Sequence, residues 1–457
     1  MKIAIVITVL AASCFSVLAQ DPDTLWTAMH GPLDRNDPEG VIQCPDLGFV
    51  IVGSSNYYNG PAQIWILKTD TSGLLVWEKL LGDSLGDYGE AVLNTEDGCY
   101  HISAITYTPE QDGANISFLK LNDSGDIVWE REFNEFEENW VRDSRNTSDG
   151  GFISVGSCGS YLTNMDGLLL KTDSTGNTEW FRTFDYGEEE FFEVVAQTSD
   201  GGYIIGGREK VFGGQADAYI VKTDSNGITE WETVLGNADY ERPKSIFQTQ
   251  DGGYIVLVTK TLSTDTNVSW LIKLDSYGDV EWDIQSSPGE PVAYSLLLAQ
   301  DGGFHMTGIG SGELWLCKVD NLGAIEWDTS VGTYASTFGK FFQQTTDEGF
   351  IVTSKVQPGS GMMDLWLVRF APKVGISGEE EPNPTVRLIS NPGAGGIRLL
   401  IDEAPLDAAV IDITGRVIHR IQQTEPTTLY VPLPAGVYHI VDQNHPYQIL
   451  RAVVLPE

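Results

Sequence analysis

The sequence has little positive charge. It contains 27 Lys and Arg residues against 65 Asp and Glu residues, which gives a formal net charge of −38. A protein that binds nucleic acid mainly through phosphate contacts needs a basic face, so this class of function is excluded. After the first twenty residues, no run approaches the roughly 18 consecutive apolar residues of a membrane-spanning helix. We therefore expect no nucleic-acid partner and no transmembrane segment.

Cysteine is scarce as well. The chain has 5 cysteines and no CxxC pair, which argues against a zinc site and against a disulfide framework. Cys44 and Cys99 occupy similar phases of neighbouring repeats, so they form the one pair to check for a disulfide. The alternative is that the cysteines are free thiols.

The first residues are typical of an export signal. Lys2 is followed by an apolar run, and the small residues Val17 and Ala19 precede Gln20 as in a signal-peptidase site. We predict a signal peptide over residues 1–19, cleaved between Ala19 and Gln20. A lipoprotein signal ending at Cys14 is the rival interpretation.

The sequence also contains seven copies of one unit, each marked by three residues at regular spacing. The first marker is tryptophan: Trp26, Trp77, Trp129, Trp180, Trp231, Trp282 and Trp327. The second is the aspartate of a turn, often DGGY: Asp46, Asp97, Asp149, Asp200, Asp251, Asp301 and Asp347. The third is a basic residue: Lys68, Lys120, Lys171, Lys222, Lys273, Lys318 and Arg369. Nearly constant spacing predicts packed structure, and most length variation falls between the second and third strands of a unit, which predicts a loop there.

Each unit contains four short runs rich in β-branched and aromatic residues, separated by Gly, Asp, Ser or Asn. Four strands per unit of about 50 residues are typical of a β-propeller blade. The seventh unit lacks a fourth strand, whereas DTLWTAMHG at 23–31 has no preceding partner. We predict an all-β protein: a seven-bladed β-propeller over residues 20–372, closed by the N-terminal strand as the outer strand of the last blade.

The repeat resembles those of secreted bacterial propellers built from DGGYI and KTDxxGxxxW units, as in KTDSTGNTEW at 171–180. It is more distantly similar to the repeats of quinoprotein propellers, but those have eight units and adjacent cysteines. The resemblance therefore implies a propeller without a quinone cofactor.

The chain changes character after Ala371. Residues 373–385 are acidic and contain proline, which predicts a linker. Residues 386–457 alternate apolar strands with turns and predict a small β-sandwich.

This C-terminal segment closely resembles the sorting domain of the type IX secretion system of Bacteroidetes-like bacteria. The matching positions, in three motifs in the family order, are Asn391, Pro392, Asp412, Gly415, Arg416, Gly436 and Tyr438. The resemblance implies that the type IX secretion machinery is a partner, that the domain is removed on export, and that the protein is secreted or displayed on the outer cell surface.

Five residues are candidates for contact with a ligand. His101 and His305 stand where other units have Val or Ile, and Arg142, Asp143 and Arg145 replace mostly apolar or small residues in the third unit. Structural roles are the alternatives. The two histidines would then be polar groups that hydrogen-bond to a neighbouring strand. The two arginines and Asp143 would form a structural ion pair. No catalytic set and no metal site can be assigned.

Amide side chains recur three residues before the turn aspartate in six units, at Gln43, Asn94, Asn146, Gln197, Gln248 and Gln344. These amides either ring the channel or join neighbouring blades. Oxygen-rich loops at 33–40 and 83–90 lack EF-hand spacing, so we expect no cofactor, with calcium as the open alternative.

The sequence therefore predicts a non-enzymatic binding or structural module whose extracellular ligand, a glycan or a protein, meets loops on one face of the ring. The alternative is an extracellular hydrolase or lyase acting on polysaccharide.

Overall fold

The computed structural model divides the chain into two units, residues 1–373 and 374–457. It describes residues 24–31, 35–56, 60–82, 85–107, 113–160, 164–185, 187, 189–210, 215–236, 239–332, 337–357, 363–371, 386–390, 396–401, 406–412, 417–423, 427–432, 436–442 and 449–454. The predicted signal peptide with Ala19 and Gln20, and the predicted linker, lie outside these residues. No helix long and apolar enough to cross a membrane occurs in the described part.

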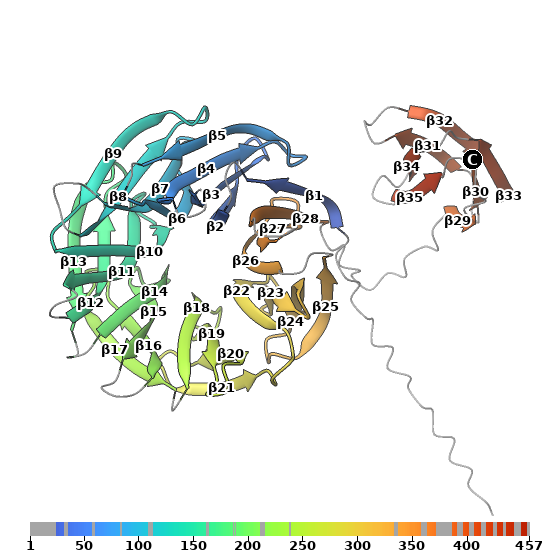
Figure 1. Ribbon diagram of the computed structural model, residues 1–457. Coiled ribbons are helices and arrows are strands. Elements are labelled where there is room, and N and C mark those ends of the chain that lie inside the picture. Colours follow the sequence, from blue (N-terminus) through green and yellow to red (C-terminus); the bar gives the residue numbers. More distant parts are fainter. Residues whose placement is uncertain are drawn as a thin grey trace, which may run out of the picture. The chain divides into compact units, whose positions relative to one another are not determined.

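The first unit is a ring of seven four-stranded antiparallel sheets, as predicted (Figure 1). The innermost strands are β2 (Arg35–Gln43), β6 (Tyr88–Asn94), β10 (Glu138–Asn146), β14 (Glu189–Gln197), β18 (Tyr240–Gln248), β22 (Val292–Leu298) and β26 (Thr337–Gln344). The second strands are β3 (Phe49–Asn56), β7 (Tyr100–Tyr107), β11 (Phe152–Ser160), β15 (Tyr203–Lys210), β19 (Tyr254–Thr261), β23 (Phe304–Gly310) and β27 (Phe350–Val356). The third strands are β4 (Gln63–Thr69), β8 (Ala114–Leu121), β12 (Asn164–Thr172), β16 (Ala216–Thr223), β20 (Asn267–Leu274), β24 (Glu313–Val319) and β28 (Asp364–Phe370).

The outer strands confirm how the ring closes. They are β5 (Leu75–Leu81), β9 (Ile127–Phe133), β13 (Thr178–Phe184), β17 (Thr229–Leu235), β21 (Val280–Gln285), β25 (Ile325–Val331) and, in the seventh blade, β1 (Thr24–His30). Strand β1 pairs antiparallel with β28, so the seventh blade is built from both ends of the propeller sequence. This pairing covers the edge that β28 would otherwise expose.

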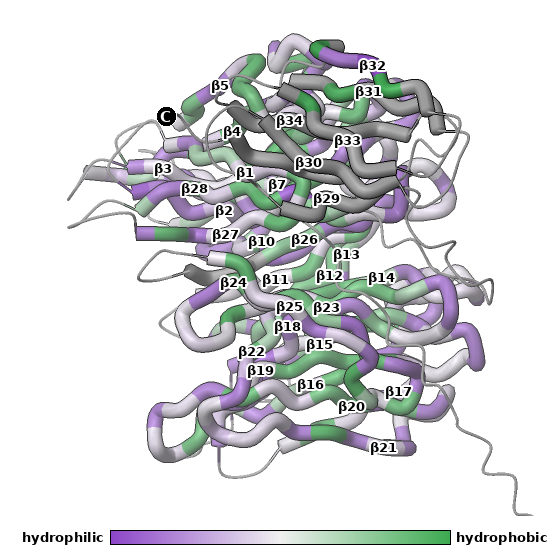
Figure 2. The backbone as a smooth tube through the Cα atoms, turned by 90° about the vertical axis from the view of Figure 1, so that its right-hand side faces the viewer, coloured by the Kyte–Doolittle hydropathy of each residue, from purple (hydrophilic) through white to green (hydrophobic). Residues whose placement is uncertain are grey.

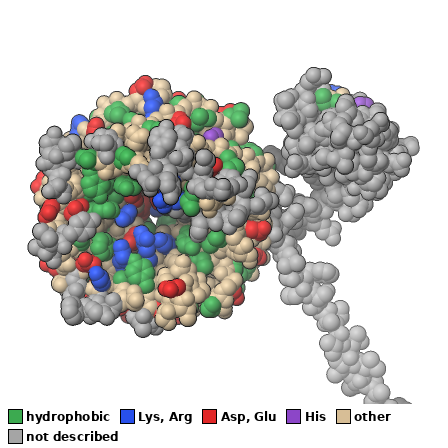
Figure 3. All heavy atoms as spheres, in the orientation of Figure 1, with side chains coloured by type: hydrophobic (Ala, Val, Ile, Leu, Met, Phe, Trp, Pro, Cys, Tyr) green, Lys and Arg blue, Asp and Glu red, His purple; other side chains and the backbone are tan. Residues whose placement is uncertain are grey.

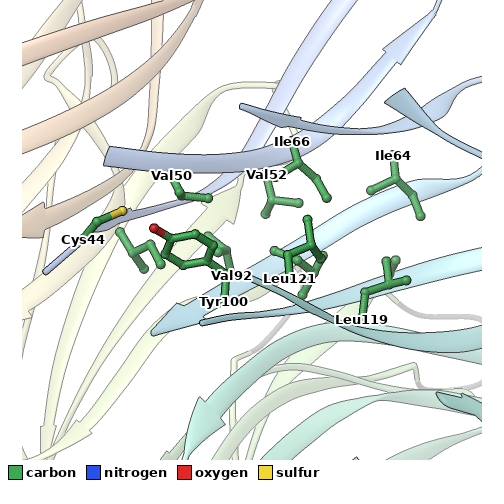
Figure 4. Packing of buried hydrophobic residues seen from close by; sticks show 12 residues of the cluster. Cys44, Val50, Val52, Ile64, Ile66, Val92, Tyr100, Leu119 and Leu121 are labelled. Carbon is green, nitrogen blue, oxygen red and sulfur yellow. The ribbon is translucent and has the colours of Figure 1, made fainter. Parts of the chain in front are cut away.

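The core lies between neighbouring blades. Middle strands such as β12 and β16 are largely hydrophobic, whereas the turns are polar (Figure 2). Between the first and second blades, Val50, Val52 and Ile66 pack with Tyr100 and Leu121 (Figure 4). Each blade therefore buries its apolar surface only when the next one is in place.

The turn aspartate fixes each blade internally, as Asp200 illustrates. Its Oδ1 accepts a hydrogen bond from the Gly202 N–H at 2.9 Å, and its Oδ2 lies 2.9 Å from Nζ of the buried Lys222. Partial burial alone would raise the pKa of Asp200, but hydrogen bonds from Thr198 and Lys222 outweigh it and lower the pKa to about 2. The innermost hairpin is thereby joined to the third strand.

In six of the seven blades, the tryptophan of the outer strand docks onto a turn of the next blade. Trp327 has no such turn to meet, because β28 and β1 of the seventh blade are not consecutive in the chain. A Cβ placed on Gly227 would lie 2.7 Å from Trp180 Cζ3, and φ at Gly227 is +76°. The same approach joins Gly73 to Trp26, which is the contact between the seventh blade and the first. Trp26 also donates from Nε1 to the Thr71 carbonyl at 3.1 Å. Glycine is required here because a side chain would occupy the position of the indole ring.

The second unit, taken by itself, consists of two antiparallel sheets with strand orders β29-β30-β33 and β32-β31-β34-β35. Its strands are β29 (Val386–Ser390), β30 (Gly396–Ile401), β31 (Leu406–Asp412), β32 (Val417–Gln423), β33 (Thr427–Pro432), β34 (Gly436–Asp442) and β35 (Ile449–Val454). Of the predicted sorting motifs, Asp412 pairs in register with Tyr438, and Gly436 begins β34. The other motif positions, Asn391, Pro392, Gly415 and Arg416, lie outside the described residues.

The docking contact predicts a difference between two Gly→Ala substitutions. Gly252 has φ of +85° with open space around its Cβ position, so Gly252→Ala should cost about 1–2 kcal/mol of unfolding free energy from backbone strain alone. Gly227→Ala adds the clash with Trp180 and should cost about 1–3 kcal/mol more. Chemical denaturation of the two variants measures the difference; equal losses would show that the tryptophan contact is unimportant.

Candidate functional site

A cavity of about 920 Å³ lies at the centre of the ring, and the innermost strand of every blade lines it. Its volume is in the range of small-molecule binding pockets. In Figure 3, Lys and Arg side chains gather around this central opening. Among the described side chains, five basic residues line the cavity: Arg142, Arg145, Arg242, Lys244 and Lys355.

A β-bulge at the same place in all seven innermost strands shapes the cavity wall. The extra residue always lies seven positions before the turn aspartate. The seven bulge residues are Glu39, Glu90, Arg142, Glu193, Lys244, Tyr294 and Lys340. A bulge redirects one side chain without ending the strand, and the first six of these residues line the cavity. The Lys340 side chain lies outside the described residues.

Three of the bulge residues, Glu90, Arg142 and Glu193, form ion pairs with arginine or glutamate. Arg142 Nη1 lies 3.4 Å from Glu90 Oε1, and the Arg142 guanidinium lies over the Trp140 ring at 5.3 Å. Glu193 receives two arginines: Arg242 Nη2 at 2.7 Å from Oε2 and Arg208 Nε at 3.1 Å from Oε1. These pairs fix the orientation of the arginines.

The charges around Glu193 determine its protonation. Its burial would raise the pKa, but the positive charges of Arg242, Lys244 and Arg208 outweigh this effect and hold the pKa below its ordinary value. Glu193 is therefore a carboxylate at neutral pH.

Asp143 links the third and fourth blades. Its Oδ2 accepts hydrogen bonds from Arg145 Nε at 3.2 Å and from the Val195 N–H at 3.1 Å. Burial raises the pKa of Asp143, although Arg145 and the backbone donors oppose the shift. The predicted trio Arg142, Asp143 and Arg145 therefore lines the cavity and forms ion pairs, and its contact with a ligand stays a prediction.

In the wall formed by the first and seventh blades, the carboxylate of the ion pair is more exposed than its basic partner. Lys355 of β27 is largely buried, and its Nζ lies 2.7 Å from Oδ2 of the more exposed Asp37 on β2. Glu39 lies on the same strand as Asp37. This side of the cavity presents carboxylates.

The two candidate histidines do not line the cavity. His101 on β7 is buried, with its ring 3.7 Å from the Phe152 ring, and burial lowers its pKa to about 3. His305 on β23 is also buried, with its ring 4.7 Å from the Phe350 ring. Both occupy positions between blades that are isoleucine or valine in the other units.

The recurring amides join neighbouring blades. Asn94 Nδ2 donates to the Gln43 carbonyl at 2.7 Å, and Gln43 Oε1 accepts from the Thr346 N–H at 2.8 Å, across the closure of the ring. Asn94 and Asn146 also line the cavity. The amides thus hold the ends of the innermost strands together.

Three carboxylates could hold a metal ion away from the cavity. Oxygens of Asp166, Asp185 and Glu190, at the junction of the third and fourth blades, lie within 4.8 Å of one another. The sequence did not single them out. The oxygen-rich loops 33–40 and 83–90 lie partly outside the described residues.

The four cysteines downstream of the predicted signal, Cys44, Cys99, Cys158 and Cys317, are free thiols in the structure. Burial raises the pKa of the Cys44 thiol to about 11, so this thiol is protonated at neutral pH.

Sequence reasoning missed Glu193, Arg242 and Lys244. The sequence contains a signal for the bulge residues. At the position seven residues before each turn aspartate, the residue type changes from unit to unit in both charge and size. A variable position among constant ones indicates a surface that the fold does not constrain. Arg242, two positions before the bulge residue Lys244, also had a signal, because five of the seven residues at this position are aromatic or valine.

No family model and no curated protein matches the sequence. Among solved structures, a polysaccharide lyase, Uly1, is similar with a TM-score of 0.50 at 12% identity, over 73% of this chain and 89% of that one. PorZ, described as an essential bacterial surface component of the type IX secretion system of Porphyromonas gingivalis, gives a TM-score of 0.44 at 11% identity over 89% of this chain. This chain covers 58% of the PorZ chain. A protein of unknown function from Dyadobacter fermentans gives 0.45 at 11% identity, over 77% of this chain and 99% of that one. Similarity at these identities shows the propeller fold alone.

The Glu193 network predicts a pH-dependent loss of stability. Because the pKa of Glu193 is lower in the folded protein, its contribution is present above the unfolded pKa and is lost as the pH falls through the folded value. Glu193→Gln should lower the unfolding free energy at pH 7 by about 2–4 kcal/mol and flatten its decline below about pH 5. Glu189 lies on the same strand as Glu193 and forms an exposed pair with Lys210 of β15, so Glu189→Gln should change the unfolding free energy by less than about 1 kcal/mol. Urea titrations from pH 7 to pH 3 test both; parallel pH profiles for Glu193→Gln and the wild type would contradict the assignment.

Proposed function

We propose that this chain is a secreted or cell-surface, non-enzymatic binding module whose ligand enters the central cavity. The observation that carries the proposal is the pairing of three of the five described carboxylates that line the cavity; of the other two, Asp37 pairs with Lys355. Glu90, Asp143 and Glu193 are each bonded to an arginine and lie largely buried behind it. General acid–base catalysis needs carboxyl groups that reach the substrate, whereas paired and buried carboxylates orient binding groups.

Export by the type IX secretion machinery is the second part of the proposal. The support is in the sequence: a signal-peptide pattern at the N-terminus and three sorting-domain motifs in the family order at the C-terminus. A binding module delivered in this way acts outside the cell, either attached to the surface or released.

Ligand binding should raise the melting temperature of the purified protein in a screen of oligosaccharides and peptides. A ligand present at one hundred times its dissociation constant adds about 2.7 kcal/mol of stability. Ser295→Phe places a ring in the cavity and should abolish the shift, because Ser295 lines the wall on β22. Thr229→Phe, on the exposed outer strand β17, should preserve it.

The same samples test the enzymatic alternative. Chromatography of the ligand after incubation should return it uncleaved. Cleavage that depends on an open cavity would instead make the protein a hydrolase or lyase. A shift that persists in Ser295→Phe would place the ligand outside the cavity.

Removal of residues 386–457 should stop export across the outer membrane. In a host with type IX secretion, the shortened chain should accumulate in the periplasm, and the complete chain should reach the surface or the medium. A host lacking the translocon should retain both forms. Export of the shortened chain would overturn this part of the proposal.

A further inference from the structure

The cavity presents arginines to solvent on one side and keeps their carboxylate partners behind them. The side chains of Arg142, Arg145 and Arg242 are 34%, 46% and 36% exposed. Their partners Glu90, Asp143 and Glu193 are 11%, 12% and 6% exposed. A molecule entering the cavity beside the third to fifth blades therefore meets guanidinium groups first.

These guanidinium groups keep most of their donors available. Each carries five N–H donors. Toward the described residues, Arg145 donates from Nε to Asp143, Arg142 donates from Nη1 to Glu90, and Arg242 donates from Nη2 to Glu193. Arg242 Nε is buried with no hydrogen-bond partner in the described structure. The remaining donors suit the forked geometry with which arginine binds a carboxylate.

The arginines lie at different depths along the channel wall. Arg142 and Arg145 are three residues apart on β10, which corresponds to roughly 10 Å of strand. Arg242 is on β18, two blades away. Groups spaced in this way match a ligand with several separated carboxylates better than a single anion.

The charge of the rest of the protein limits the kind of anion that can approach. With a net charge of −38, the surface repels a long polyanion of high charge density. Repulsion from distant surface charges is screened over about 8–10 Å in physiological salt, so a small ligand inside the cavity is affected mainly by the arginines. The volume of about 920 Å³ also sets an upper limit on size.

We propose that the cavity binds a short oligomer bearing several carboxylates, which Arg142, Arg145 and Arg242 hold by charged hydrogen bonds. This inference rests on the proposed binding function and specifies its ligand class. Two sources share the chemistry: an oligouronide and a short acidic peptide.

Titration calorimetry on the purified protein tests the ligand class with paired probes. Trigalacturonate is compared with its methyl ester, and triglutamate with triglutamine. We expect binding of at least one acidic probe and a loss of about tenfold or more for its neutral analogue. The acidic probe that binds identifies the source.

Two variants assign the binding to the arginines. Arg145→Gln removes the most exposed of the three groups and should weaken binding by about tenfold or more, as should Arg242→Gln. Arg131→Gln, on the exposed outer strand β9, is the matched control and should bind as the wild type does. Melting curves of the variants show that each is folded; Arg145→Gln is the decisive one because its side chain is the least buried.

Four results would overturn the inference. Equal binding of neutral and acidic probes, or unchanged affinity in Arg145→Gln, would leave the cavity as a binding site with another ligand class. Tighter binding of heparin than of either acidic trimer would show that long polyanions are preferred. The melting screen can find a ligand whose stabilising effect is lost in Ser295→Phe while no acidic probe binds. That result would reject the ligand class without rejecting the binding function.

Discussion

The contact between the tryptophan of one blade and the turn glycine of the next determines the structure of the ring. A single blade has an apolar face that it cannot bury by itself, and the indole of its outer strand needs the space that only glycine leaves. The buried lysine and the turn aspartate give each blade a fixed hairpin against which the neighbouring blade packs. Because these two features recur in nearly every unit, the blades stack at a constant spacing. The central cavity is the space that this spacing leaves.

The bulges separate the chemistry of the cavity from the stability of the ring. The paired residues on either side of a bulge continue the sheet, so the bulge residue itself can change from glutamate to arginine, lysine or tyrosine without altering the strand pairing. Ion pairs of the bulge residues Glu90, Arg142 and Glu193 then orient the charged groups. The blades supply the geometry, and the bulge residues together with Arg145 and Arg242 supply most of the charged groups of the cavity.

The fold could be predicted from the sequence because its signals repeat. The spacing of Trp, Asp and Lys identified the blades, and the unpaired strand around Trp26 indicated the closure with β28. The bulges were not visible because one extra residue in every unit leaves the repeat spacing unchanged. His101 was predicted as a ligand contact because of its chemical type. Its equivalents in other units, Ile153 and Ile204, are fully buried, so the position belongs to the core. Within the cavity, Arg145 was found because the other units have mostly apolar residues in its phase. Arg142 was found beside it, although its phase is charged in most units. Arg242 was missed although it and Asp37 are the charged exceptions in a phase that is otherwise aromatic or valine.

Closure by β1 has a consequence for the time at which the ring can form. Residues 24–30 pair with residues 365–370, so this contact joins segments that are among the most distant in the propeller sequence. Contacts of such high sequence separation have a large loop-closure cost and are characteristic of slow folding. During synthesis, β1 has no partner until the last strand of the seventh blade has emerged, and until then both ends of the growing stack have unpaired edges. The interval before closure is therefore the period in which the chain is most exposed to aggregation and in which a chaperone that covers strand edges would have the greatest effect.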